Sequence, residues 1–380
     1  MNTSIHIRGD GAAGLALALS LAHQGLASRV IAGPTDTAAS DLRAWALNGA
    51  SKELLAALNV WDQLPAAAVT PIQAMRVQGD QGGVLEFSAW QAKQPALGWI
   101  VDAAPLLDML RQAARFAPLV TLAPFEEAPA AAPGLTVLCE GRDSPTRERG
   151  HRAAGHGLFS LRQHPYGHSA LAGHVHSALA NGGQAWQWFR HGEVLALLPR
   201  DGGYGLVWSL PHERAAALQQ QGPQAIAQAL NEATGGLAGE LSMTATAALW
   251  PLRLAHDSAL YGAFAPGSSW VLAGDAAHAI HPLAGQGLNL GLADVRVLAE
   301  VLAQARKDSP WRGSDDLSVL ARYARQRHGP VTRMARTCDA LWQAFAQPHP
   351  LAAPLRNLGL DAVNALTPLK TWLVRQALQG

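Results

Sequence analysis

The sequence predicts an α/β protein in which a Rossmann-like dinucleotide-binding lobe is interleaved with a lobe built on a mixed β-sheet, followed by C-terminal helices. Three observations carry this prediction. A strand, a glycine-rich turn and a helix open the chain within residues 3–24, and a second glycine-rich motif follows a strand near residue 270. Between them, residues 185–210 contain the turn residues of an antiparallel meander. The two glycine motifs therefore flank the second lobe in the sequence.

Composition excludes several other classes of protein. The 380 residues are 49% hydrophobic and 15% charged, which rules out a disordered chain and is enough for two lobes. A net charge of +1 argues against nucleic-acid binding as the main task. The two cysteines, Cys139 and Cys338, offer neither a disulfide framework nor a zinc spacing, and the N-terminus lacks a signal-peptide pattern. We therefore expect a cytoplasmic protein without a metal site.

The first part of the chain alternates strands with helices. Residues 3–8 and 29–32 are expected to be strands joined by a helix over residues 15–24, which is a βαβ unit. The elements expected next are a helix at 42–58, antiparallel strands within 71–87, a helix at 102–116 and a buried strand at 134–139. The Ala- and Pro-rich stretch 128–133 is the one linker-like segment.

The second part changes from sheet to helix. Three strands are expected within residues 185–210, and the histidine-bearing stretch 151–176 before them is expected to be a loop, since it lacks the regular spacing of metal ligands. The elements expected afterwards are a polar helix at 211–232, a buried strand at 270–273, a long helix at 287–305 and further helices to residue 380.

The first glycine motif is Gly9-Asp10-Gly11-Ala12-Ala13-Gly14, with the spacing GxGxxG between a strand and a helix. Gly9 allows the tight turn, Gly11 lets the backbone approach a pyrophosphate, and Gly14 lets helix and strand pack closely. The N–H groups at the start of the helix then face the phosphates. This motif predicts a dinucleotide site.

The second motif runs from Gly274-Asp275 to Gly285-Gln286-Gly287-Leu288-Asn289. A strand delivers the Asp275 carboxylate beside a glycine, and a loop containing Pro282 leads to a Gly-Gln-Gly turn that opens another helix. The start of that helix is a second site for negative charge. Because a reduced flavin ring carries negative charge, a protein with both sites can hold a flavin dinucleotide by its pyrophosphate and by its ring.

Further segments carry a resemblance to a known family. They are residues 41–47, 97–101, 139–147, 188–189, 195–199 and 206–209, together with the motif at 274–294. In these segments the chain resembles the flavin-dependent aromatic hydroxylases of the para-hydroxybenzoate hydroxylase fold group, and within that group most of all the hydroxylases of ubiquinone biosynthesis. The resemblance covers nearly the whole chain and implies a dinucleotide-binding lobe of the GR2 type.

The resemblance implies the chemistry and the domain boundaries. NAD(P)H, for which the group has no separate Rossmann domain, would reduce FAD, and one atom of O2 would pass to an activated aromatic ring. The implied FAD-binding domain comprises residues 1–65, 97–160 and 255–340, the substrate domain comprises 66–96 and 161–254, and a helical segment comprises 341–380.

The resemblance also implies the cofactor-binding residues. The glycine turn would hold the pyrophosphate, Arg43 would lie along FAD, and Asp275 would bond the ribityl hydroxyls. The backbone from Gly285 to Asn289 would face the flavin ring. The full set is Gly9, Gly11, Ala12, Ala13, Gly14, Arg43, Glu140, Gly141, Asp275, Gly285, Gln286, Gly287, Leu288 and Asn289.

The adenosine half of the implied site departs from the family's pattern. The second strand ends in Ala32-Gly33 without the acid that takes the ribose hydroxyls, and the nearest acid along the chain is Asp36. The helix after residue 101 begins without the family's arginine, Glu140 replaces an aspartate, and Asp10 places a carboxylate in the phosphate turn. The segment 117–133 is also shorter than the family's. These changes predict weaker FAD binding and leave a loss of redox activity open.

Candidates for catalysis and substrate binding follow from the same motifs. His278 and His281 would relay a proton from a phenolic substrate or, alternatively, bond the loop backbone, and Pro282 would fix the loop over the flavin. Arg253 would anchor a phenol or lie in solvent. Four tryptophans would either wall an aromatic pocket or pack in the core: Trp186, Trp188, Trp208 and Trp250.

The expected substrate is a polyprenylated phenol on the way to ubiquinone, with O2 as the second substrate. The alternatives are a hydroxylase of a small soluble aromatic, and a non-catalytic protein that binds a prenyl quinone or serves in assembly. Residues 351–378 would dock on a membrane or a biosynthetic complex, or pack on the FAD-binding lobe.

Overall fold

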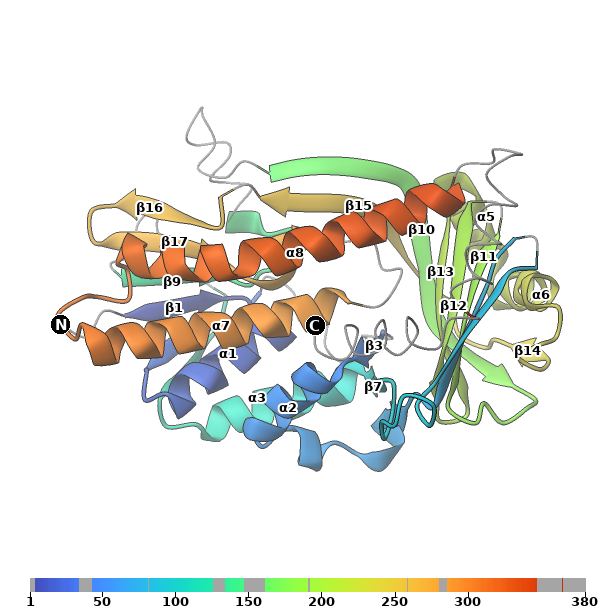
Figure 1. Ribbon diagram of the computed structural model, residues 1–380, viewed down its shortest axis with the longest axis horizontal. Helices are drawn as coiled ribbons and strands as arrows, with labels where there is room; N and C mark the ends of the chain where they lie inside the picture. Colours follow the sequence, from blue (N-terminus) through green and yellow to red (C-terminus); the bar gives the residue numbers. More distant parts are fainter. Residues whose placement is uncertain are drawn as a thin grey trace.

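The computed structural model describes residues 4–33, 43–80, 82–125, 134–146, 161–190, 192–257, 259–279, 286–346 and 364. Within them the strands form sheets of six, nine and three strands. The six-stranded sheet lies at one end of an elongated molecule and the nine-stranded sheet at the other, with the long helix α8 (Leu317–Ala346) running between the two ends (Figure 1). The mixed α/β fold predicted from the sequence is confirmed.

The six-stranded sheet has the order β16-β17-β9-β1-β2-β8 and is parallel except for β16 at its edge. The strands are β1 (Ile5–Arg8), β2 (Ser28–Ile31), β8 (Val120–Ala123), β9 (Gly134–Leu138), β16 (Tyr261–Ala265) and β17 (Ser268–Leu272). The strand β8 occupies the segment after residue 117 that the sequence indicated was too short for the usual strands.

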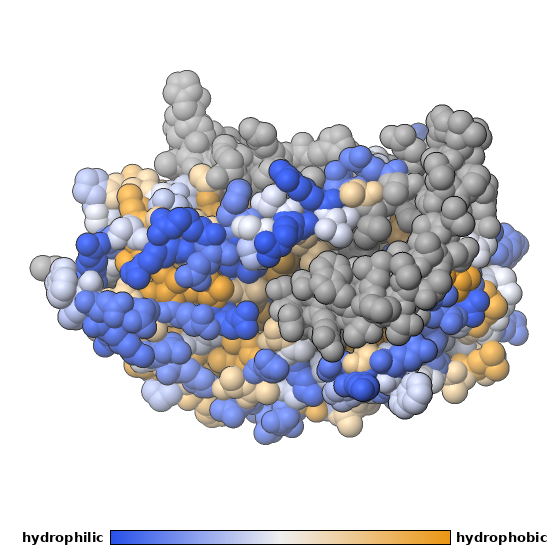
Figure 2. Space-filling model, in the orientation of Figure 1, coloured by the Kyte–Doolittle hydropathy of each residue, from blue (hydrophilic) through white to orange (hydrophobic). Residues whose placement is uncertain are grey.

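Helices α1 (Ala12–His23) and α3 (Ala103–Phe116) pack on this sheet, and α7 (Gly287–Asp308) packs on α1. The residues of α1 from 14 to 21 are all buried, because its Ala- and Leu-rich sequence has no polar face to turn outward. In Figure 2 hydrophilic residues cover the outer sides of α7 and α8, and hydrophobic ones lie between the two helices. The apolar core therefore runs from the sheet through α1 to α7 and α8.

The three-stranded sheet contains β3 (Ala44–Leu47), β7 (Trp99–Asp102) and β4 (Val69–Pro71). The prediction of a helix at 42–58 is therefore wrong for its first half. The segment Ala44–Leu47 pairs antiparallel with β7, and Asn48 then caps α2 (Gly49–Ala57) by accepting a hydrogen bond from the Ser51 N–H at 2.9 Å. Pairing with a distant strand overrides the helix propensity of alanine and leucine here.

The nine-stranded sheet carries the second lobe. Its strands are β5 (Ala74–Gln78), β6 (Val84–Ser88), β10 (Leu161–Ser177), β11 (Gln184–Arg190), β12 (Glu193–Arg200), β13 (Gly203–Pro211), β14 (Leu241–Ser242), β15 (Ala248–Asp257) and β18 (His278–Ala279). The meander predicted within 185–210 is confirmed as β11, β12 and β13. Helices α5 (His212–Gln221) and α6 (Pro223–Thr234) cover a core on one face of this sheet.

Two further expectations are corrected in this lobe. The stretch 151–176, expected to be a loop, is strand β10 from residue 161 onward, because it pairs on one side with β13 and on the other with β15. The helix expected at 211–232 is divided at Gly222, whose φ of +92° is a conformation that favours glycine. Short 3₁₀ turns complete the described elements: η2 (Trp61–Gln63), η3 (Ala66–Ala68) and η4 (Gly274–Ala276). Among the described residues no helix combines the length and apolarity that crossing a membrane requires.

Candidate active site

The glycine loop after β1 is shaped by close backbone contacts. A Cβ on Gly9, whose φ is +104°, would lie 2.4 Å from the Cys139 carbonyl oxygen, and a Cβ on Gly14 would lie 1.9 Å from the Gly9 oxygen. A Cβ on Gly11 would meet nothing within 4 Å among the described atoms. Helix α1 starts directly after Gly11 with no acid in its first turn and no side-chain cap from the described part of the chain. Its N–H groups are therefore available to an anion.

The second glycine motif brings the start of α7 to the start of α1. Gly274 has a φ of +66°, and a Cβ there would lie 3.2 Å from the Ala13 side chain. A Cβ on Gly291 of α7 would lie 3.2 Å from the Cα of Gly274. The exposed carboxylate of Asp275 then lies beside the first turn of α7, 3.6 Å from where a Cβ of Gly287 would be. Small residues thus let two helix N-termini and one carboxylate meet at one edge of the parallel sheet.

Asn289 fixes the start of α7 through its side chain. Its amide oxygen accepts hydrogen bonds from the Asn48 N–H at 3.0 Å and the Ser51 hydroxyl at 2.7 Å. Its amide nitrogen donates to the Ala46 carbonyl at 2.8 Å and to the Gln286 side chain at 3.0 Å. All four hydrogen-bonding positions of the buried amide are used. The side chain therefore anchors α7 to β3 and α2, and only the backbone of Asn289 remains to face a ligand.

His278 lies in a buried group of charges behind the motif. Its Nε2 is 2.7 Å from one carboxylate oxygen of Asp294, and Arg327 of α8 donates to the other at 2.5 Å. The Gly274 N–H also donates to Asp294, at 2.8 Å. Burial opposes the charged imidazole, but the Asp294 carboxylate outweighs it and raises the pKa of His278. This histidine is 3% exposed and is not among the described residues that line the cavity.

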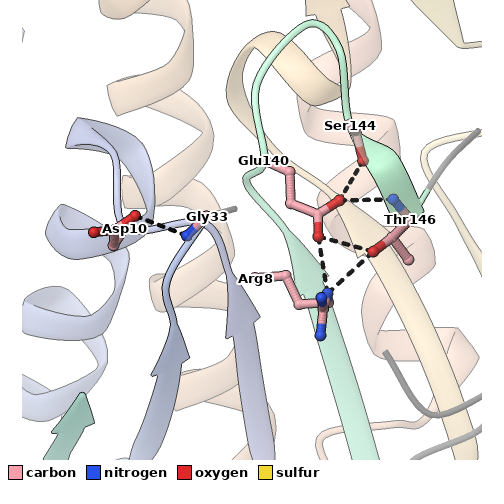
Figure 3. Close-up of polar contacts among 6 residues, drawn as sticks. All are labelled: Arg8, Asp10, Gly33, Glu140, Ser144 and Thr146. Atoms are coloured by element: carbon pink, nitrogen blue, oxygen red, sulfur yellow. Dashed lines mark hydrogen bonds and ion pairs between the residues drawn. The ribbon is translucent and has the colours of Figure 1, made fainter. Parts of the chain in front are cut away.

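Glu140 lies in a second buried group, at the end of β9 (Figure 3). Arg8 donates to one of its oxygens at 2.8 Å, and the Ser144 hydroxyl donates to the other at 2.6 Å. Thr146 donates to both oxygens, through its hydroxyl at 2.8 Å and its N–H at 3.0 Å. Burial opposes ionisation, but the hydrogen bonds from Ser144, Thr146 and Arg8 hold the pKa of Glu140 below its usual range. The carboxylate braces the loop that carries Gly141.

A cavity of about 350 Å³ lies where the two lobes meet. Its walls come from β3, from β5, β10, β11, β12, β13 and β15 of the nine-stranded sheet, and from Asp275 and the first residues of α7. The Arg43 guanidinium lies over the Trp45 ring at 5.3 Å and over the Trp250 ring at 5.1 Å, and so joins the two lobes at the cavity wall. Arg142 lines the same cavity and donates to the Pro251 carbonyl at 3.3 Å.

The four candidate tryptophans divide between the cavity and the core. Trp250 lines the cavity. Trp188 and Trp208 are 3% and 1% exposed and pack beneath α5 and α6. Trp186 borders the cavity, but its ring stacks on Trp188 with centroids 5.4 Å apart and packs against the same core. Of the two roles expected for these tryptophans, lining the pocket and packing in the core, both are therefore found.

Several predicted residues lie outside the described part of the chain. His281, Pro282 and Gly285 fall in residues 280–285, and the side chain of Arg253 is likewise not described. Residues that sequence reasoning missed include Trp45, Arg142 and the buried Asp294. The sequence signals Arg142 and Asp294 weakly, because their partners lie far along the chain, Pro251 for Arg142 and Arg327 for Asp294.

Comparison with known proteins decides the family. A family model described as an FAD binding domain matches residues 133–337. The chain is also 31% identical over 400 residues to 3-demethoxyubiquinol 3-hydroxylase of Escherichia coli, a match that covers 99% of this chain and 98% of the relative. The chain belongs to the FAD-dependent aromatic hydroxylases. The family predicted from the sequence motifs is confirmed.

Other relatives of this hydroxylase agree. The chain is 28% identical over 394 residues to ubiquinone hydroxylase UbiL of Rhodospirillum rubrum, a match that covers 98% of this chain and 88% of the relative. Its fold matches that of p-nitrophenol 4-monooxygenase PnpA from Pseudomonas putida with a TM-score of 0.77 at 16% identity, over 99% of this chain and 98% of the other. HpxO of Klebsiella pneumoniae, in a structure complexed with FAD and uric acid, matches with a TM-score of 0.72 at 18% identity, over 99% of this chain and 97% of the other.

The residues present in this hydroxylase fit its FAD cofactor. The open side of Gly11 and the uncapped start of α1 suit a pyrophosphate, and the exposed Asp275 suits a sugar chain that leads toward the cavity. The start of α7 has no acid in its first turn and, within the described residues, no side-chain cap, so it suits the negative edge of a reduced flavin.

Proposed function

We propose that this FAD-dependent hydroxylase acts on the aromatic ring of a polyprenylated phenol in ubiquinone biosynthesis, with NAD(P)H as electron donor and O2 as second substrate. The observation that carries the proposal is the cavity at the junction of the lobes, which places an apolar wall opposite Asp275 and the start of α7. The relatives in Escherichia coli and Rhodospirillum rubrum are named as hydroxylases of ubiquinol or ubiquinone compounds, which supports the same substrate class.

The cavity wall suits a ring that carries an apolar tail. Five residues on its sheet side are small, namely Ala170, Ala172, Ala185, Ala196 and Gly205, and larger residues line the rest of that side, among them Ile72, Leu198, Leu252 and Trp186. Short side chains leave width for a flat ring. Burying a prenyl unit against such a wall yields about 25 cal/mol for each Å² of apolar surface removed from water. A small polar aromatic would gain much less from the same wall.

Each site residue receives a role in this proposal. Bound FAD supplies the redox chemistry, since it takes electrons from NAD(P)H and activates O2. The glycine loop, Gly9 to Gly14, holds its pyrophosphate, Asp275 accepts hydrogen bonds from its ribityl hydroxyls, and the first turn of α7 balances charge at the ring. Arg43 closes the cavity wall between the lobes. His278 positions the strand-to-helix loop by way of Asp294, and His281 is the histidine we assign to proton transfer.

A series of substrates that differ only in tail length tests the proposal. FAD-loaded protein is given NAD(P)H, O2 and the same phenol with no tail, one prenyl unit or several, and the product is followed by mass spectrometry as a gain of one oxygen atom. We expect kcat/KM to rise with each added unit. A rate that is highest without a tail would instead support a small soluble aromatic. Protein that binds FAD but yields only hydrogen peroxide with every phenol would remove the support for ring hydroxylation of these substrates. Protein that never binds FAD would support the non-catalytic alternative.

A further inference from the structure

The end of β2 lacks the acid that dinucleotide-binding folds use to bond the adenosine ribose, since the strand is followed by Ala32 and Gly33. A carboxylate is nevertheless present at this place. Asp10 extends from the glycine loop to the end of β2, where its Oδ1 accepts a hydrogen bond from the Gly33 N–H at 3.0 Å (Figure 3). An acid from the neighbouring loop thus reaches the position where an acid of β2 would lie.

Arg111 holds this carboxylate from the other side. It lies on α3 and its guanidinium is 3.1 Å from Oδ2 of Asp10. The Asp10 side chain is 27% exposed and the Arg111 side chain 20% exposed, so a ligand at the loop can reach the pair. The positive charge of Arg111 also offsets the repulsion that a carboxylate in a phosphate-binding turn would otherwise exert on a pyrophosphate.

The carboxylate retains capacity for further hydrogen bonds. An ionised carboxyl group has about four acceptor positions, and among the described residues the hydrogen bonds from Gly33 and Arg111 occupy one on each oxygen. We propose that Asp10 accepts hydrogen bonds from the ribose hydroxyls of the adenosine half of FAD, in place of the missing acid of β2, and that Arg111 is a positioning residue for it. The proposal rests on FAD binding and not on the identity of the aromatic substrate.

Two other roles for Asp10 predict different binding data. If the carboxylate only ties the glycine loop to β2, its loss weakens all flavin ligands equally. If it repels the pyrophosphate, its removal tightens FAD binding. Only a ribose contact makes the binding depend on the ribose hydroxyls.

The test compares FAD with an analogue whose adenosine half is 2′,3′-dideoxyadenosine. Binding of each to protein freed of cofactor is measured from the quenching of flavin fluorescence. Wild-type protein should prefer FAD by about tenfold to a hundredfold, the range for hydrogen bonds to a charged group. Asp10→Asn should lose most of this preference by weakening FAD alone. Asp108→Asn, an exposed acid on the same helix as Arg111, is the matched control and should keep the full preference.

The preference is a ratio measured within one protein, so a partial loss of folded protein does not change it. Arg111→Gln should reduce the preference and also weaken both ligands, since the carboxylate then lies unbalanced near the pyrophosphate. The proposal is overturned if Asp10→Asn keeps the preference, if wild-type protein shows none, or if Asp10→Asn binds FAD more tightly. Wild-type protein that binds neither ligand would contradict the function as well, whereas the other outcomes leave the function standing.

Discussion

The two ends of the FAD site are built in different ways. At the flavin end, a buried triad of His278, Asp294 and Arg327 supports the loop on which the exposed Asp275 lies. At the proposed adenosine end, Asp10 lies in the glycine turn itself and pairs with Arg111 of α3, and both side chains are partly exposed. The flavin end therefore separates the residues that support the fold from those that meet the ligand, and the adenosine end does not.

This difference in construction indicates where substitutions are tolerated. The flavin end depends on backbone groups at the start of α7 and on close packing among Ala13, Gly274 and Gly291, so few substitutions there are compatible with the fold. At the proposed adenosine end the contact is an ion pair with about a quarter of each side chain in solvent, and such pairs contribute little to the stability of the fold. Substitutions at the two ends should accordingly affect different measurements.

The largest effect should come from the buried support of the flavin end. Asp294→Ala leaves Arg327 and His278 without their shared counter-charge, which should cost about 3–5 kcal/mol of unfolding free energy. Chemical denaturation of the cofactor-free protein measures it. Glu86→Gln, which breaks the exposed pair with Arg76, should cost less than about 1 kcal/mol. Equal losses in the two variants would show that the triad is not the support we describe.

The second-largest loss of stability is expected from substitution of the buried Glu140, and this loss should depend on pH. Its pKa in the folded protein lies below the ordinary 4.5, so its contribution to stability is complete above about pH 4.5 and is lost as the pH falls through the folded-state pKa. Glu140→Gln should therefore lower the unfolding free energy by about 1.5–3 kcal/mol at pH 7. Denaturation curves of both proteins from pH 7 to pH 3 should converge at the acid end. A gap that widens with acid would contradict the assigned direction of the pKa.

Asp275→Asn should act on ligand binding instead of on the fold. Because the carboxylate is exposed, the unfolding free energy should barely change, while FAD should bind about tenfold to a hundredfold more weakly. Fluorescence titration measures this loss, and the variant should retain its preference for FAD over the dideoxyadenosine analogue. If the variant binds FAD as tightly as wild type, Asp275 is not the residue that bonds the sugar chain.

The smallest effect is expected from restoring the family's acid at the end of β2. Since Asp10 already places a carboxylate there, Ala32→Glu adds a second negative charge and should change FAD affinity by less than about threefold, equivalent to roughly 0.6 kcal/mol. The same titration measures it. A tenfold gain in affinity would mean that the position was unoccupied by any useful acid, and that Asp10 faces elsewhere in the complex.

Local patterns predicted those parts of the molecule that local physics determines. The βαβ unit, the first glycine turn and the meander follow from residue spacing and turn chemistry, and all three are present. The segment Ala44–Leu47 was predicted to be helical because alanine and leucine favour helix, but β7, more than 50 residues along the chain, pairs with it. The pairing of Asp10 with Arg111 spans 101 residues, so the sequence showed a misplaced acid and not its partner. Contacts of this kind require the fold before they can be recognised.

Ring hydroxylation by the FAD-loaded protein is the central property proposed for this chain. The decisive measurement supplies NAD(P)H and ¹⁸O₂ with a prenylated phenol and follows three quantities together: NAD(P)H consumed, labelled product and hydrogen peroxide. We expect each product molecule to carry one ¹⁸O atom as a new hydroxyl group on the ring. We also expect the phenol to accelerate NAD(P)H consumption, and peroxide to fall as product rises. Product without the label, or labelled peroxide alone with every phenol tested, would contradict the assignment of this chain as a hydroxylase of prenylated phenols.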